Sequence, residues 1–212
     1  MSLAQHVIHH PLFALIYERI WRPLTFFSVS GRTPRADRID AERTLRLRSA
    51  RTLLDIGCGP GNFTLYLSRR LGSGAHAIGL DFSVPMLEQA RADNVGPGVS
   101  YVRADARRLP FPDGGFDAVC CFGSLYLIED PMVAAGEMIR VLAPGGRISI
   151  STSYRRPGWF GRMITAYFSR LGLRFFDAEE FPKLFADAGL VEVEHQVHGL
   201  LQYLSATRPV AA

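Results

Sequence analysis

An acid, a row of glycines and a second acid in the first half of the chain have the types and spacing of a ligand site. Residues 51–65 read RTLLDIGCGPGNFTL, in which an acid is followed by glycines at every second position: Asp55, Gly57, Gly59 and Gly61. Glycine lets the backbone bend where a Cβ would clash, and it lets a ligand approach the main chain closely. Asp81 comes 20 residues after the last of these glycines, a distance that suits a carboxylate accepting hydrogen bonds from two ribose hydroxyls. The pattern predicts a site for a ligand that carries a ribose.

These residues fall where strands are expected to end. Leu53, Leu54 and Ile56 form the short apolar run of a buried parallel strand, and a helical pattern resumes after the glycines. Further strands are expected over 76–81, 99–103, 116–122, 147–151, 190–197 and 201–207, with helical segments between most of them. Alternating strands and helices predict an α/β doubly wound sheet, which binds ligands at the carboxyl ends of its strands.

The glycine pattern resembles the first motif of the class I S-adenosylmethionine-dependent methyltransferases. A dinucleotide site usually spaces its last two glycines by three residues, and this chain does not. Residues 140–147, RVLAPGGR, are a second resemblance, at the turn into the fifth strand. Within the family the chain looks most like small-molecule methyltransferases of the ubiquinone/menaquinone-biosynthesis type. The resemblance implies a mostly parallel seven-stranded, Rossmann-like sheet with an antiparallel terminal hairpin. It also implies S-adenosylmethionine as cofactor and S-adenosylhomocysteine as product.

The resemblance assigns roles to the residues at the strand ends. It implies that Asp81 holds the ribose, that Asp105 accepts a hydrogen bond from the adenine amino group, and that the Ala106 N–H meets a ring nitrogen. Phe82 or Met86 would lie against the adenine face. A helix cap is the alternative role for Asp105. The full expected cofactor set is Asp55, Gly57, Cys58, Gly59, Gly61, Asn62, Asp81, Phe82, Met86, Asp105, Ala106 and Cys121.

The acceptor side of the site is less defined. Many small-molecule methyltransferases of this type have a histidine pair where Tyr126 and Leu127 stand here, which leaves any general base unassigned. The substrate-pocket candidates are His10, Tyr17, Tyr126 and Tyr154. A surface histidine or a packing aromatic is the alternative for each. We assign no catalytic residue, and no Cys/His spacing fits a metal site.

The chain divides into an N-terminal helical cap (1–50) and a methyltransferase domain (51–212). In the cap, helices are expected over about 12–21 and from Pro34 to about Ser49. Residues 154–176 form an insertion with an apolar stripe at helical spacing and five arginines. Packing on the core is the simplest interpretation of this insertion. A lid over the substrate pocket and contact with a membrane surface are the alternatives.

Composition sets the outer limits. The chain has 212 residues, is 48% hydrophobic and carries a net charge of +4 at pH 7. That mild basic excess permits contact with nucleic acid or an anionic membrane but requires neither. No apolar run approaches the roughly 20 residues of a spanning helix, and the first 30 residues lack the pattern of a signal peptide. The three cysteines are interpreted as buried thiols, which favours a cytoplasmic setting.

The expected function is in-line methyl transfer to a small, hydrophobic or aromatic molecule. A nucleic-acid (RNA) methyltransferase is an alternative, although the arginines are scattered and the Asn/Asp-Pro-Pro-aromatic motif of amino-methylating enzymes is absent. A non-catalytic S-adenosylmethionine-binding module is another, because Tyr126 departs from the family pattern. An NAD(P)-dependent oxidoreductase is a third, but it leaves Asp105 without a role. The oligomeric state is not specified by the sequence.

Overall fold

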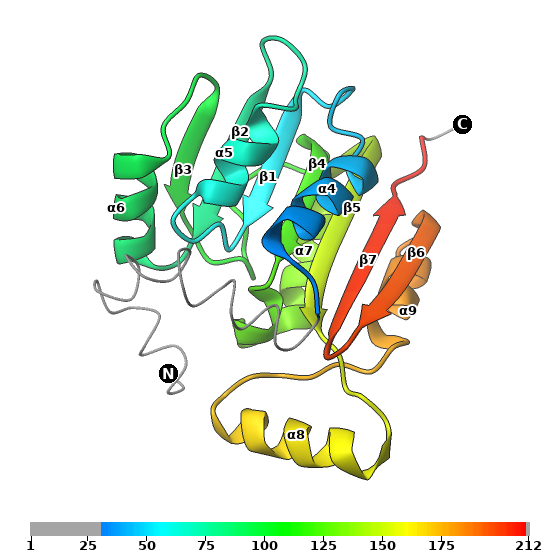
Figure 1. The fold of residues 1–212 in the computed structure, drawn as a ribbon. Coiled ribbons are helices and arrows are strands. Elements are labelled where there is room, and N and C mark those ends of the chain that lie inside the picture. Colours follow the sequence, from blue (N-terminus) through cyan, green and yellow to red (C-terminus); the bar gives the residue numbers. More distant parts are fainter. Residues whose placement is uncertain (1–30, 211–212) are drawn as a thin grey trace.

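A seven-stranded sheet forms the centre of the molecule (Figure 1). The computed structural model describes residues 31–210, so His10, Tyr17 and the helix expected over 12–21 lie outside the described residues. The strands are β1 (Thr52–Ile56), β2 (His76–Asp81), β3 (Val99–Arg103), β4 (Phe116–Phe122), β5 (Leu142–Ser153), β6 (Val191–His198) and β7 (Leu201–Thr207). Their order is β3-β2-β1-β4-β5-β7-β6, with β7 antiparallel to both neighbours and the other pairs parallel. The expected fold class is confirmed.

Helices cover both faces of this sheet. They are α4 (Pro34–Thr44), α5 (Asn62–Ser68), α6 (Val84–Asp93), α7 (Pro131–Val141), α8 (Gly158–Arg170) and α9 (Glu180–Asp187), with a short 3₁₀ turn over Leu125–Leu127. In Figure 1, α4 and α5 lie in front of the sheet and α7 and α9 behind it. Each face has its own buried cluster, one with Phe63 and Leu67 of α5 and the other with Met138 of α7 and Phe181 and Phe185 of α9.

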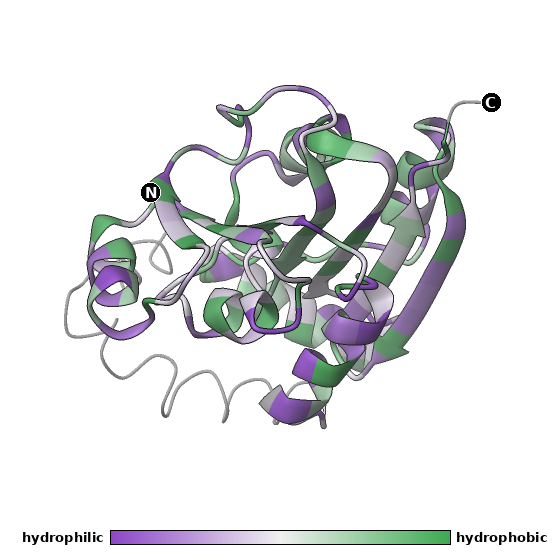
Figure 2. Cartoon of the chain, turned by 90° about the horizontal axis from the view of Figure 1, so that it is seen from above, coloured by the Kyte–Doolittle hydropathy of each residue, from purple (hydrophilic) through white to green (hydrophobic). Residues whose placement is uncertain are grey.

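The helices that flank the sheet are amphipathic, and they carry both hydrophilic and hydrophobic segments in Figure 2. The apolar side of each packs on the sheet, because removing apolar surface from water is the main favourable term in folding. The centre of the sheet is the most deeply buried part: in β4, Ala118, Val119, Cys120 and Cys121 have no exposed surface. This rigid centre positions the strand ends at which the candidate site lies.

Helix α4 is shorter than the sequence predicts. Thr33 caps its start as expected, since its Oγ1 accepts a hydrogen bond from the N–H of Ala36 at 3.3 Å. The helix ends at Thr44, not near Ser49, and Arg46 has a φ of +49°. Leu45 and Leu47 are both only 1% exposed. Residues two apart point in nearly opposite directions on a helix, so the chain must leave the helix to bury both.

A buried arginine ties the terminal hairpin to α4 and β5. Arg147 of β5 is 3% exposed. Its guanidinium donates to the Thr44 carbonyl at the end of α4 (2.7 Å), to Thr207 Oγ1 of β7 (2.7 Å) and to Ser205 Oγ of β7 (3.2 Å). It also pairs with the exposed carboxylate of Glu192 on β6 at 3.1 Å. One side chain thus joins four elements through charge-assisted bonds.

The insertion 154–176 packs on the core only at its end, where Phe175 and Phe176 are buried, and helix α8 itself stays largely exposed, so the simplest interpretation of the sequence holds for part of the insertion. Helix α8 lies beyond the carboxyl ends of β4 and β5, at the bottom of Figure 1. Gly161 is its one buried residue, and a Cβ there would overlap the backbone of Arg156 rather than the core. Neighbouring segments cover only part of its apolar stripe, because only one side of the helix meets the rest of the protein. The lid interpretation of this insertion stays a prediction, as does the domain boundary at residue 50.

Candidate functional site

The glycine turn after β1 is held against the end of β2 by main-chain bonds. The N–H groups of Gly57 and Cys58 both donate to the Leu80 carbonyl, at 2.7 and 3.0 Å. Gly57, Gly59 and Gly61 all have positive φ, 69°, 54° and 82°, a region that L-residues with a Cβ rarely enter. The turn therefore needs glycine for its backbone shape alone, before any ligand is considered.

Asp81, at the end of β2, holds the same turn from its side chain. One carboxylate oxygen accepts a hydrogen bond from the Gly59 N–H at 2.8 Å, and the other accepts from the Ser83 N–H at 2.8 Å. Ser83 is the N-cap residue of α6, as expected, but its hydroxyl makes no capping bond. The Asp81 carboxylate therefore joins the glycine turn to the start of α6 at the edge of a cavity that it also lines.

Ser124, just past β4, lies opposite the first glycine. Its Oγ donates to the Ile56 carbonyl at 3.2 Å and lies 3.0 Å from Cys121 Sγ. A Cβ added to Gly57 would overlap the Ser124 side chain. Cys121 itself is fully buried, and this burial raises the pKa of its thiol to about 12. The raised pKa favours the neutral thiol, which packs behind Ser124, and the expected contact of Cys121 with the cofactor stays a prediction.

Asp55 faces the protein interior. It is 2% exposed, and its Oδ2 accepts a hydrogen bond from the Thr64 hydroxyl of α5 at 2.6 Å, while Oδ1 lies 3.5 Å from Cys120 Sγ. Because Thr64 stands three residues after Gly61, this bond fixes how α5 leaves the glycine turn. Asp55 shapes the turn and does not line the cavity, and its expected contact with the cofactor stays a prediction.

The third strand contributes the other wall of the glycine turn. The Tyr101 hydroxyl donates to the Asn94 carbonyl at 2.7 Å, and the Asn94 side-chain amide donates to the Pro60 carbonyl at 2.7 Å. A Cβ on Gly61 would overlap the Tyr101 ring. Burial raises the pKa of Tyr101, so its hydroxyl remains a donor. The last glycine of the row is thus required by a tyrosine 40 residues further along the chain.

Asp105 is paired with an arginine two residues away. Its carboxylate receives bonds from Arg107 Nε (3.1 Å), Arg107 Nη2 (2.8 Å) and the Arg107 N–H (2.9 Å). These hydrogen bonds lower the pKa of Asp105. Arg107 also reaches Glu129 at 2.8 Å and Asp130 at 3.4 Å across the cavity. The bond from the Arg107 N–H caps the short turn that follows Asp105, which is the alternative role that the sequence offers, and the same carboxylate also anchors the arginine that reaches Glu129 and Asp130.

One cavity of about 1150 Å³ runs along the carboxyl ends of β1, β2 and β4. Of the expected cofactor residues, Gly57, Asp81, Phe82, Asp105 and Ala106 line it. Phe82 is 57% exposed, with the Arg103 guanidinium 5.4 Å from its ring centre. The cavity therefore brings together an exposed aromatic face, two carboxylates and a glycine turn from three segments far apart in sequence.

The other expected residues stand behind the cavity wall or away from it. Met86 is 2% exposed and Cys58 is 6% exposed, and neither lines the cavity. Tyr126 packs against the core, and Tyr154 forms an isolated bridge with Phe176. Gly59, Gly61 and Asn62 form the turn without lining the cavity. The expected roles of these residues stay predictions.

Most of the other lining residues were not predicted, and Ser124, Arg107 and Met132 are three of them. Folding brings Ser124 and Arg107 next to the predicted residues, and nothing in their local sequence distinguishes them from other polar residues. Met132, at the start of α7, belongs to the far half of the cavity. We call this part the apolar half, after the side chains of Ile128, Met132, Leu173, Phe175 and Phe176 that line it. The cavity is also lined there by charged side chains, those of Glu129, Asp130, Arg155, Arg174 and Glu180.

No three His, Cys, Asp or Glu side chains of residues 31–210 gather in a way that would hold a metal ion. No helix in this part of the chain has the length and apolar character needed to cross a bilayer.

Comparison with known proteins identifies close sequence relatives. The methyltransferase domain family matches residues 54–150. The demethylmenaquinone methyltransferase of Lactococcus lactis is 35% identical over 173 residues, which cover 70% of this chain and 69% of that protein. The demethylmenaquinone methyltransferase of Thermus thermophilus is 41% identical over 127 residues, which cover 58% of this chain and 57% of that protein. The aligned part is thus little more than half the length of the Thermus relative.

Solved structures share the fold. A SAM-dependent methyltransferase from Aquifex aeolicus superposes with a TM-score of 0.67 at 17% identity, covering 94% of this chain and 98% of that one. The [4+2]-cyclase SpnF superposes with a TM-score of 0.69 at 22% identity, covering 83% and 81%. Because one neighbour is described as a cyclase, the shared fold does not by itself define a reaction.

Proposed function

Since this chain belongs to the S-adenosylmethionine-dependent methyltransferases of the menaquinone-biosynthesis type, we propose that it methylates a small hydrophobic aromatic acceptor of the quinone class. The donor supplies a methyl group on a positively charged sulfur, which an acceptor atom displaces in line. Relatives of this kind do not favour an oxidoreductase, an RNA methyltransferase or a non-catalytic module. The observation that carries the acceptor class is the apolar half of the cavity, which adjoins the cofactor half.

The residues at the strand ends fit S-adenosylmethionine. The Asp81 carboxylate stands at the cavity edge with its side chain already oriented by the N–H groups of Gly59 and Ser83. Preorganised groups of this kind bind a ligand without a further ordering cost. Phe82 offers an exposed aromatic face, and Asp105 is held ionised by Arg107. We assign ribose binding to Asp81 and adenine recognition to Phe82, Asp105 and Ala106.

The chain's own contribution to the reaction is placement and exclusion of water. Ile128, Met132 and Phe176 would hold an aromatic acceptor by its faces, and Glu129, Asp130 and Glu180 are the carboxylates on the same side of the cavity. An acceptor that loses a proton on methylation needs a base. We leave that role unassigned among these carboxylates.

Calorimetric titration with S-adenosylhomocysteine tests the cofactor assignment. The Asp81→Asn variant keeps the size of the side chain but loses its charge, and charge-assisted hydrogen bonds are worth about 1.5–3 kcal/mol, so affinity should fall about 10- to 100-fold. Asp93→Asn, at the exposed end of α6, is the matched control and should bind like the native protein. Equal affinity in both variants, or binding of NAD instead, would contradict the assignment.

The acceptor assignment has its own test. Methyl transfer to a short-chain demethylmenaquinone analogue, offered in its oxidised and reduced forms, is followed by mass spectrometry. Met132→Glu places a charge in the apolar half of the cavity and should abolish transfer while leaving S-adenosylhomocysteine affinity within a few-fold. Val95→Glu is the control, because Val95 is 67% exposed and does not line this cavity. Transfer that survives Met132→Glu would place the acceptor elsewhere.

The proposal includes a cellular setting. Buried, unpaired thiols support a reducing compartment, and we propose that the protein works in the cytoplasm. An acceptor of this class is soluble in lipid, so peripheral contact with a membrane is part of the proposal. Nucleic acid is not among the proposed partners, because the relatives act on a quinone by name.

A further inference from the structure

Helix α8 presents an apolar stripe that no other described part of the chain covers. Trp159, Met163 and Tyr167 follow one another at a spacing of four residues, so they share one side of the helix. They are 75%, 53% and 61% exposed, and Phe160 beside them is 48% exposed. The next residues around the helix, Ile164 and Phe168, are half-buried toward the protein. The apolar arc is therefore wider than the part of it that the body of the protein covers.

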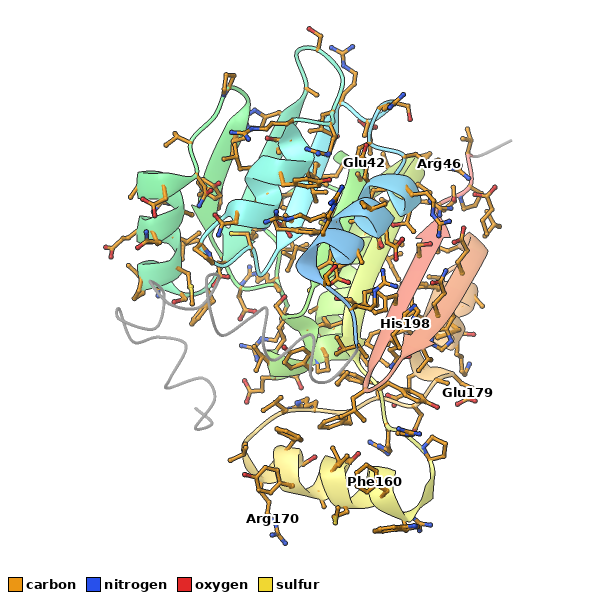
Figure 3. The ribbon with its side chains drawn as sticks, in the orientation of Figure 1. Glu42, Arg46, Phe160, Arg170, Glu179 and His198 are labelled. Carbon is orange, nitrogen blue, oxygen red and sulfur yellow. The ribbon has the colours of Figure 1, made fainter. Side chains whose placement is uncertain are left out.

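The segment that carries this stripe has positive charges only. From Tyr154 to Phe176 the chain has five arginines and no acidic residue. Within residues 31–210, no carboxylate pairs with Arg156, Arg162 or Arg170, whereas Arg155 pairs with Asp177 at 3.3 Å. Figure 3 shows Arg170 extending from α8 away from the sheet. A helix with exposed Trp and aromatic residues on one side and arginines at its borders has the composition of a helix that lies in a lipid interface.

The position of α8 connects this surface to the cavity. Ser169 lies in its last turn, and Gly172 and Leu173 follow it; all three line the cavity described above. Phe168, on the inner side of α8, contacts Phe175 of the cavity wall, with ring centres 6.4 Å apart. The exposed stripe therefore borders the apolar half of the cavity rather than the cofactor half.

We propose that α8 lies in the surface of an anionic lipid bilayer, with Trp159, Met163 and Tyr167 inserted below the headgroups and Arg156, Arg162 and Arg170 on lipid phosphates. Positive charge without local acids is complementary to an anionic lipid surface and not to a second copy of this same basic helix. In this orientation the apolar half of the cavity opens toward the bilayer, and a lipid-borne acceptor enters from it. The entry route rests on the proposed function; the surface binding does not.

Vesicle sedimentation tests the surface binding. The full chain should pellet with phosphatidylcholine vesicles that contain phosphatidylglycerol, and much less with phosphatidylcholine alone or at high salt. The chain has two tryptophans, Trp21 and Trp159, so a Trp21→Phe variant leaves Trp159 as the only reporter. Its emission should shift to shorter wavelength on binding and be quenched by brominated acyl chains. Unchanged emission with anionic vesicles would overturn the proposal.

Matched variants distinguish vesicle binding through the α8 stripe from non-specific binding through other exposed apolar residues. Trp159→Ala, Met163→Ala and Tyr167→Ala together should abolish pelleting, while Ile39→Ala with Val95→Ala, two exposed apolar residues elsewhere, should not. Each arginine near a membrane surface is worth roughly fivefold in affinity, so Arg162→Ala with Arg170→Ala should lose roughly 25-fold. Arg48→Ala with Arg69→Ala, exposed and away from α8, is the control pair. Equal losses in test and control variants would contradict the proposal.

Two further measurements distinguish the possible failures. S-adenosylhomocysteine affinity and transfer to a water-soluble acceptor should be unchanged in the triple α8 variant, while transfer to a vesicle-borne acceptor should fall more than tenfold. Vesicle binding without any methyl transfer would reject the proposed function and keep the membrane surface. A native dimer by light scattering that the α8 variant converts to a monomer, with no vesicle binding, would show that a second copy covers the stripe and would overturn the proposal.

Discussion

Gly57 is the point at which backbone shape and side-chain packing make the same demand. Its φ of +69° suits glycine, and its missing Cβ makes room for Ser124, which follows the neighbouring strand β4. A methyl group at this position would therefore raise the free energy of the folded state in two ways, by backbone strain and by overlap with Ser124. The residue is thus a structural requirement of the turn, whether or not a ligand contacts it.

We predict that Gly57→Ala destabilises the protein far more than Gly74→Ala. Gly74 has a similar φ of +72° with nothing within 4 Å of an added Cβ, so it isolates the backbone cost, roughly 1–2 kcal/mol. Gly57→Ala adds the overlap with Ser124, for a further cost of about 1–3 kcal/mol. Urea unfolding measures both. Adding Ser124→Gly should recover most of the difference, whereas Ser124→Ala should not, because the Ser124 Cβ also lies in the overlap.

A second prediction concerns the pH dependence of cofactor binding. Arg107 lowers the pKa of Asp105 by hydrogen bonding, while burial alone would raise it. The native carboxylate therefore stays charged to lower pH than usual, and affinity for S-adenosylhomocysteine should fall only in strongly acidic solution. In Arg107→Leu the favourable cause is removed, so the acidic fall in affinity should move to higher pH. Calorimetry across the acidic range, with Arg108→Leu as the exposed neighbour, measures the midpoint; identical midpoints would refute the role of Asp105.

A third prediction concerns the thiols. Burial raises the pKa of Cys58, Cys120 and Cys121, so the reactive thiolate is scarce in the folded protein. We expect a colorimetric disulfide reagent to titrate no thiol quickly in native buffer and all three in denaturant. A fast native reaction would show that one of them opens to solvent.

At the scale of elements, Arg147 shows how side-chain hydrogen bonds hold the terminal hairpin against its neighbours. Two arginines, Arg147 and Arg46, reach the same carboxylate of Glu192. Arg147 is buried and also satisfies the end of α4 and two hydroxyls of β7, whereas Arg46 is more than half exposed. Exposed pairs contribute little because water screens them. The buried Arg147 therefore contributes more to holding the hairpin than the exposed Arg46.

We predict that Arg147→Met lowers stability by about 2 kcal/mol, because it leaves buried acceptors without donors. For a chain of this size that corresponds to a fall in Tm of roughly 4–8 °C. Arg46→Met removes the exposed contact to the same Glu192 and should leave Tm almost unchanged. Differential scanning fluorimetry of the two variants makes the comparison, and similar shifts would mean that Glu192 rather than the buried network sets the stability.

What the sequence could predict among the elements is what depends on neighbours in the chain. The run of β1 into the glycine turn and the Thr33-Pro34 start of α4 are local patterns, and the structure has them as predicted. The end of α4 depends on burying Leu45 and Leu47 together, and the isolation of α8 depends on what fails to cover it. Both depend on contacts between residues far apart in the sequence, and the local hydrophobic pattern does not report such contacts.

The same division applies to the candidate site. Asp81 and Asp105 were predictable because strand ends are recognisable and ligands bind there. Ser124 and Arg107 enter only because β4 and the segment after β3 come together in space. The inward orientation of Asp55 follows from Thr64, whose hydroxyl no spacing rule would have selected.

At the scale of the whole molecule, the site stands at one edge of the sheet, and its walls come from several short segments spread along the chain between Ile56 and Glu180. A ligand that fits this edge ties those segments together only in the folded state. Binding should therefore be visible as global stabilisation and not only as a local change.

We predict that S-adenosylhomocysteine at about 100 times its Kd stabilises the fold by about 2.7 kcal/mol, a rise in Tm of roughly 5–11 °C. Asp81→Asn should need correspondingly more ligand for the same rise, whereas Asp93→Asn should follow the native curve. Thermal melts at several ligand concentrations test this. A Tm independent of ligand would mean that the cavity does not bind this molecule in the folded state.

The placement of the three thiols has a chemical consequence if the proposed quinone acceptor is correct. Oxidised quinones are electrophiles, and such an acceptor would alkylate an accessible thiolate beside it. Cys121 lies one side chain behind the cavity wall, covered by Ser124 and kept in its neutral form. The side chain of Ser124 would thus separate the Cys121 thiol, a soft nucleophile, from an electrophilic acceptor bound in the cavity.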